Sequence, residues 1–93
     1  MIDLFFETYQ ECQLTNMKIV DSYPVQQWQH YIVSFSSDAL PAELEDPEAL
    51  IIFSEFGNVL QVVLREEGCD SPHFQFTELE KKQLTDWIQN EFT

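Results

Sequence analysis

The hydrophobic positions near the N-terminus repeat with the period of an α-helix. Counting from Ile2, apolar side chains recur at the third, fourth, seventh and tenth following positions, which places them on one face of a helix. Glu7 and Glu11 fall away from that face. The pattern therefore predicts a helix over residues 2–12. Its buried stripe would consist of Ile2, Phe5, Phe6, Tyr9 and Cys12.

Alternating apolar and polar positions predict strands in the next part of the chain. Residues 17–23 alternate imperfectly and end at Pro24. Because proline has no backbone N–H to donate, we expect this strand at the edge of a sheet. Residues 30–36 alternate more regularly and predict a second strand, with Tyr31, Val33 and Phe35 on one face.

Two apolar runs, residues 50–56 and 59–65, flank the dipeptide Gly57-Asn58. This dipeptide suits a two-residue hairpin turn with glycine at its first central position. Both faces of the hairpin are largely apolar, so we expect it in the centre of a sheet that is covered on at least one side. The expected pairs across the turn are Phe56 with Val59, Phe53 with Val62, and Ile51 with Leu64.

The last segment has the pattern of a capped helix. Thr77 is a suitable N-cap, and Glu80 three residues later completes a capping box. A short strand over residues 73–76 would precede it. Together these elements predict one α+β domain over residues 1–93. Its fold would be a single antiparallel sheet of four to five strands, with an N-terminal and a C-terminal helix packed on one face. The C-terminal helix would bury Leu84, Trp87 and Ile88.

The charge of the chain restricts its partners. Asp and Glu number 17 against 4 Lys and Arg, which gives a formal net charge of −13. The chain is 44% hydrophobic and 14% aromatic, so this charge belongs to a folded domain rather than a disordered acidic tail. Such a molecule repels nucleic acid and anionic membranes and attracts basic surfaces. No apolar run approaches the ~18 residues needed to span a bilayer, and no secretory signal is recognisable. Cys12 and Cys69 are interpreted as free thiols of a cytoplasmic protein, and the sequence leaves a single disulfide between them as the alternative.

The sequence contains little evidence of a catalytic or metal-binding site. The chain has no nucleophile elbow and no glycine-rich phosphate loop. His30 and His73 fall in predicted strands. Cys69 and His73 have one metal-like spacing, but structural zinc sites usually contain two close ligand pairs. We therefore expect no enzymatic activity, no metal and no other cofactor.

Two acidic segments, residues 37–48 and 65–71, are the candidate binding surfaces. Pro41 and Pro47 bound the acidic part of the first segment and reduce the entropy it loses on docking. Fixed carboxylates of this kind suit a basic groove and accelerate association with it. Trp28, in a glutamine-rich stretch, is the expected aromatic anchor. The candidate partner-binding residues are Asp38, Glu43, Glu45, Asp46, Glu48, Glu66, Glu67, Asp70 and Trp28.

These observations predict a small acidic binding protein that occludes a basic surface of a protein partner. The leading version is an inhibitor or immunity protein that mimics nucleic acid and acts on a nuclease, toxin or other nucleic-acid-binding protein. The alternative is a non-catalytic accessory subunit whose charge serves solubility while an apolar surface makes the contact. Salt separates the two, because charge steering is screened over a Debye length of about 8 Å at physiological ionic strength. The sequence leaves the oligomeric state open.

Overall fold

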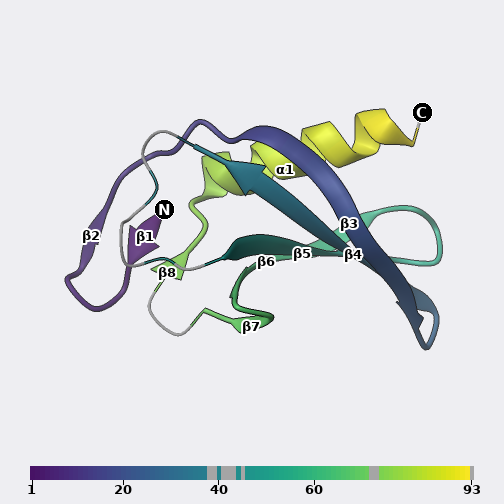
Figure 1. Ribbon diagram of the computed structural model, residues 1–93. Helices are drawn as coiled ribbons and strands as arrows, with labels where there is room; N and C mark the ends of the chain where they lie inside the picture. Colours follow the sequence, from purple (N-terminus) through teal and green to yellow (C-terminus); the bar gives the residue numbers. More distant parts are fainter. Residues whose placement is uncertain (38–39, 41–43, 45, 72–73, 93) are drawn as a thin grey trace.

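The computed structural model describes residues 1–37, 40, 44, 46–71 and 74–92, and within them the chain forms two antiparallel sheets and one helix (Figure 1). The five-stranded sheet has the order β3-β4-β5-β6-β7 and the three-stranded sheet the order β2-β1-β8. The prediction of a single sheet with an N-terminal and a C-terminal helix is therefore wrong. The elements are β1 (Ile2–Asp3), β2 (Thr8–Tyr9), β3 (Thr15–Val25), β4 (Trp28–Ser36), β5 (Pro47–Phe53), β6 (Val59–Glu66), β7 (Cys69–Asp70), β8 (Phe74–Gln75) and α1 (Glu78–Glu91).

The segment predicted as an N-terminal helix instead forms the β1–β2 hairpin. β1 pairs with β2 on one side and with β8, near the other end of the chain, on the other. The carboxylate of Asp3 accepts hydrogen bonds from the backbone N–H groups of Phe5 and Phe6, at 3.0 and 3.2 Å, and so holds the turn. Strand pairing over this long sequence separation overrides the local helical period. Phe5, Phe6 and Tyr9, predicted to be buried, are exposed.

The strand β3 lies at the edge of the five-stranded sheet, as predicted from Pro24. It pairs with β4, which confirms the strand predicted over residues 30–36. The pairing of β3 shifts register twice, between Thr15 and Lys18 and between Ile19 and Asp21. These irregularities are β-bulges, in which one strand contains extra residues and bends.

The β5–β6 hairpin exists as predicted, but its turn and register differ. Ile51 lies opposite Val62 and Phe53 opposite Val59. A five-residue loop, 54–58, replaces the two-residue turn, because the Ser54 hydroxyl accepts hydrogen bonds from the N–H groups of Phe56 and Asn58, both at 3.2 Å. Up to Ile52 the register differs from the predicted one by two residues, so these side chains keep their predicted faces of the sheet. An irregularity between Ile52 and Phe53 places Val59 opposite Phe53, against the core and not on its predicted face.

The second acidic segment, predicted as a loop, contains the short strand β7. Glu67 and Gly68 have φ angles of 52° and 84°, as a tight hairpin turn with two left-handed residues requires. β7 then pairs with the end of β6, with Asp70 opposite Arg65. This turn brings the carboxylates of the segment back onto the sheet.

The C-terminal helix and its capping box are confirmed. The Thr77 hydroxyl accepts a hydrogen bond from the Glu80 N–H at 3.2 Å, and the Glu80 carboxylate accepts one from the Thr77 N–H at 2.9 Å. Leu84 and Ile88 are fully buried in the same core as the sheet residues Val33, Ala49 and Ile51. α1 therefore covers one face of the five-stranded sheet, the inner face (Figure 1). Among the described residues, no helix is long and apolar enough to cross a lipid bilayer.

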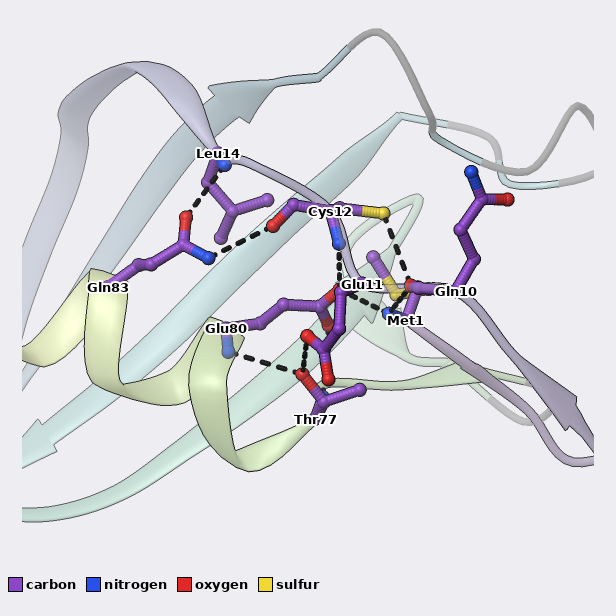
Figure 2. Close-up of polar contacts among 8 residues, drawn as sticks. All are labelled: Met1, Gln10, Glu11, Cys12, Leu14, Thr77, Glu80 and Gln83. Carbon is purple, nitrogen blue, oxygen red and sulfur yellow. Dashed lines mark hydrogen bonds and ion pairs between the residues drawn. The ribbon is translucent and has the colours of Figure 1, made fainter.

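A buried polar network joins the start of the chain to α1 (Figure 2). The carboxylate of Glu80 forms an ion pair with the ammonium group of Met1 and accepts a hydrogen bond from the Cys12 N–H at 2.9 Å. The Gln83 side chain accepts from the Leu14 N–H at 2.8 Å and donates to the Cys12 carbonyl at 3.0 Å. Burial raises the pKa of the Cys12 thiol, so this thiol stays protonated and unreactive at neutral pH.

Candidate partner-binding surface

The face of the five-stranded sheet opposite α1 carries apolar side chains. In antiparallel strands, residues directly opposite each other project to the same side. Ile32, Leu50 and Val63 form one such row across β4, β5 and β6, and His30 and Ile52 lie in the next row. α1 is the only helix in the described part of the chain, and it packs on the inner face. We name this uncovered surface the outer sheet face; it comprises Tyr23, Val25, Trp28, His30, Ile32, Leu50, Ile52 and Val63.

The centre of the outer sheet face is closely packed although no described helix lies on it. Ile32 at its centre is only 5% exposed, although it does not belong to the core beneath α1. The rings of Tyr23 and His30 lie 5.3 Å apart between centroids. Both ring nitrogens of His30 are buried and have no hydrogen-bond partner among the described residues. Buried polar atoms without a partner are uncommon in native folds, and they often mark functional positions.

Five of the predicted carboxylates gather at one end of this sheet. Glu48, near the start of β5, lies opposite Arg65 of β6, and Arg65 lies opposite Asp70 of β7. Neighbouring strands are about 4.8 Å apart, so these side chains lie close together. The two acidic segments predicted from the sequence therefore meet. We name the five carboxylate residues at this end of the sheet, Asp46, Glu48, Glu66, Glu67 and Asp70, the acidic end. Glu48 and Asp70 project to the outer sheet face, whereas Glu66, opposite Pro47 and Cys69, projects to the inner face.

The acidic end has a negative formal charge. Five carboxylates against the one guanidinium of Arg65 leave a formal charge of −4. The guanidinium donates a hydrogen bond to the carbonyl of Gly68. Glu66 accepts a hydrogen bond from the Ser71 hydroxyl at 3.1 Å. The other predicted carboxylates, Asp38, Glu43 and Glu45, lie outside the described residues.

Trp28 lies at the opposite end of the outer sheet face. It is 39% exposed and lies opposite Val25 at the β3–β4 turn. Six residues along β4 separate it from Ser34, which lies opposite Glu48 of the acidic end. At 3.3 Å per residue this separation is about 20 Å. The structure therefore does not bring Trp28 and the acids together, and a partner that contacts both must extend along the whole sheet.

Two apolar faces were expected on the hairpin over residues 50–65, but none of its apolar residues was predicted as a binding site. Alternate residues of these strands, such as Ile51 and Val62, face the core beneath α1. The residues next to them, such as Ile52 and Val63, face the other way and form the outer sheet face. A strand with apolar residues on both of its faces indicates that both faces make contacts. The sequence could not show which face α1 would leave uncovered.

The described residues contain no group of three or more His, Cys, Asp and Glu side chains that could hold a metal ion. Cys69 is exposed on β7, and His73, its proposed companion, lies outside the described residues. Both cysteines are free thiols.

Comparisons of the chain with protein-family models, curated proteins and solved structures find no match.

Proposed function

We propose that this chain is a small acidic binding protein that occludes a basic surface of a protein partner. The observation that supports the proposal is the convergence of two acidic segments at one end of an uncovered, apolar sheet face. The carboxylates would attract and orient a basic partner, and the apolar centre would make the short-range contact. Trp28 would act as an anchor at the far end, since tryptophan is enriched among residues that dominate binding energy.

The partner class that suits this surface best is a nuclease, toxin or other nucleic-acid-binding protein. Such proteins present basic grooves to phosphate groups, and a row of fixed carboxylates competes for the same groove. The role would be that of an inhibitor or immunity protein, without catalysis. The net charge of −13 opposes direct binding of nucleic acid or anionic membranes. The two free thiols support a cytoplasmic location.

A second candidate function is that of an accessory subunit in a larger complex. The apolar outer sheet face favours it, because uncovered apolar patches on folded domains are typical of protein interfaces. In that case the charge would serve solubility, and the association rate would depend little on salt.

The test separates the two candidates by removing charge without changing shape. A partner is first recovered on the immobilised chain from an extract of its source cells, at low and at high salt. Association rates with that partner are then measured for Asp46→Asn/Glu48→Gln/Glu67→Gln/Asp70→Asn, which we name the acidic-end variant. The control removes three charges away from the acidic end and from the β1–β2 hairpin, as Glu55→Gln/Asp86→Asn/Glu91→Gln.

The acidic-end variant should associate about tenfold more slowly and with a weaker salt dependence. The control variant should change the rate by less than about threefold. Trp28→Ala should instead speed dissociation. If the acidic-end variant keeps the association rate and salt dependence of the original chain, charge steering at this end is refuted and the accessory subunit is favoured.

A further inference from the structure

The β1–β2 hairpin presents aromatic rings to solvent far more fully than the outer sheet face does. Phe5 and Phe6 at its turn are 70% and 69% exposed, and Tyr9 on β2 is 70% exposed. Leu4 beside them is also exposed. Exposed apolar clusters of this kind mark contact sites in soluble proteins. We name these four residues, Leu4, Phe5, Phe6 and Tyr9, the aromatic tip.

The aromatic tip is held in place by the fold. The Asp3 carboxylate binds the N–H groups of Phe5 and Phe6, and the Gln10 N–H donates to the Met1 carbonyl at 3.0 Å. The rings of Phe5 and Phe6 meet edge to face, 5.2 Å apart between centroids. A contact surface that is already ordered loses little conformational entropy on binding.

A hollow of about 650 Å³ lies between the aromatic tip and the start of α1. The apolar residues that line it include Leu4, Tyr9 and Phe76. Its one basic residue, Lys81, lies 3.6 Å from the carboxylate of Glu78, measured between nitrogen and oxygen. The hollow is therefore apolar on its walls and negative in net charge. Its acidic lining residues are Asp3, Glu7, Glu11 and Glu78.

We propose that the aromatic tip and this hollow bind arginine side chains of a basic protein partner. A guanidinium group is planar, stacks on aromatic faces and pairs with carboxylates, whereas the lysine ammonium is a compact, strongly hydrated charge. Aromatic rings beside carboxylates therefore favour arginine over lysine. The net charge of −13 opposes a second copy of the chain or an anionic membrane as the occupant. The inference rests on the proposed function in one respect, that the partner is basic.

The experiment uses fluorescein-labelled nona-arginine and nona-lysine peptides as probes of equal charge. Binding to the full chain is followed by fluorescence anisotropy at physiological salt. The original chain should bind nona-arginine about tenfold more tightly than nona-lysine. In Phe5→Leu/Phe6→Leu/Tyr9→Leu, which stays apolar but loses the rings, this ratio should fall to about one while nona-lysine affinity is unchanged. Circular dichroism confirms that the variant is folded.

The matched control is Phe56→Leu, which removes a ring that is 82% exposed in the loop 54–58. It should keep the preference for arginine. An equal affinity of the original chain for both peptides would overturn the inference, as would a triple variant that retains the preference. Binding to phosphatidylcholine vesicles that the triple variant loses would also overturn it, by assigning the aromatic tip to lipid.

The acidic-end variant distinguishes this inference from the proposed function. It should keep the arginine preference, because the acidic end lies on the five-stranded sheet and the aromatic tip on the three-stranded sheet. Loss of the preference in the acidic-end variant alone would refute an arginine site at the tip and leave the proposed function standing. Failure of the proposed function would appear elsewhere, as an unchanged association rate of that variant with its partner.

Discussion

Among single residues, Glu80 connects the most distant parts of the chain. Its fully buried carboxylate contacts the Met1 ammonium and the Cys12 N–H (Figure 2). It also accepts a hydrogen bond from the Thr77 N–H. Glu80→Ala should lower the free energy of unfolding by about 3–5 kcal/mol, because it leaves a buried positive charge without its counter-ion. Glu80→Gln keeps one acceptor oxygen and should have an intermediate effect. Urea unfolding followed by tryptophan fluorescence measures both.

The control for this prediction lies in the same turn of the helix. The side chain of Glu78 is 94% exposed, so Glu78→Gln should change the free energy of unfolding by no more than about 0.5 kcal/mol. A loss of less than about 1 kcal/mol for Glu80→Ala would mean that the buried pair does not stabilise the fold.

The sequence alone predicts only some of the contacts that Glu80 makes. The spacing of Thr77 and Glu80 predicts the capping box, because both partners lie within one helical turn. The burial of Glu80 and its contact with Met1 depend on where β1 pairs, which no local pattern specifies. The same holds for His30, whose unpartnered nitrogens become visible only once the sheet is assembled.

At the scale of elements, Thr77 determines how α1 begins and how it meets the β1–β2 region. Its hydroxyl accepts from the Glu80 N–H and donates to the Glu11 carboxylate at 2.6 Å. Thr77→Ala should cost about 1–2 kcal/mol of stability and speed hydrogen exchange in the first turn of α1. Thr77→Ser keeps the hydroxyl and should lose only a few tenths of a kcal/mol. A serine variant as unstable as the alanine variant would show that the methyl group, not the cap, matters.

Elements with strong local signals are predicted correctly from the sequence. α1 has its cap and its apolar stripe, β4 alternates regularly, and Pro24 correctly indicates an edge strand. The hairpin β5–β6 is right in existence and wrong in register, because a single serine hydroxyl at Ser54 organises a longer loop. The N-terminal helix fails because apolar residues spaced at a helical period also fit a hairpin whose tip is exposed.

At the scale of the whole molecule, the net charge of −13 should limit stability. Like charges repel each other in the compact state more than in the unfolded chain. Raising salt from low to physiological concentration screens this repulsion and should raise the melting temperature by a few degrees, since about 1 kcal/mol corresponds to roughly 4–8 °C in a domain of this size. Differential scanning calorimetry measures the shift.

The acidic-end variant provides the comparison, because it carries four fewer negative charges and should gain less from salt. A melting temperature that falls when salt is added would show that favourable ion pairs outweigh repulsion. Pairs such as Lys82 with Asp86, at 2.7 Å, would then be the stabilising contacts.

The sequence predicts which residue types make up the candidate surface, but not how they are arranged in space. The acidic residues and Trp28 are visible in the composition, but their arrangement depends on the β7 turn at Gly68 and on the pairing of β5 with β6. These features place five carboxylates at one end and the tryptophan about 20 Å away. Strand order is a property of the whole chain, so no single segment predicts it.

The irregular edge strand β3 also bears on how this protein avoids aggregation. If a sheet has an apolar outer face and a regular edge strand, other chains can pair with that edge and extend the sheet into an aggregate. The bulges near Lys18 and Asp21, and the missing N–H of Pro24, make this edge a poor template for such growth. Near the isoelectric point of about 4.1, where the net charge is close to zero, repulsion between molecules is weakest and the backbone geometry of β3 becomes the main protection of this edge. The bends of β3 then keep that edge from seeding fibrils.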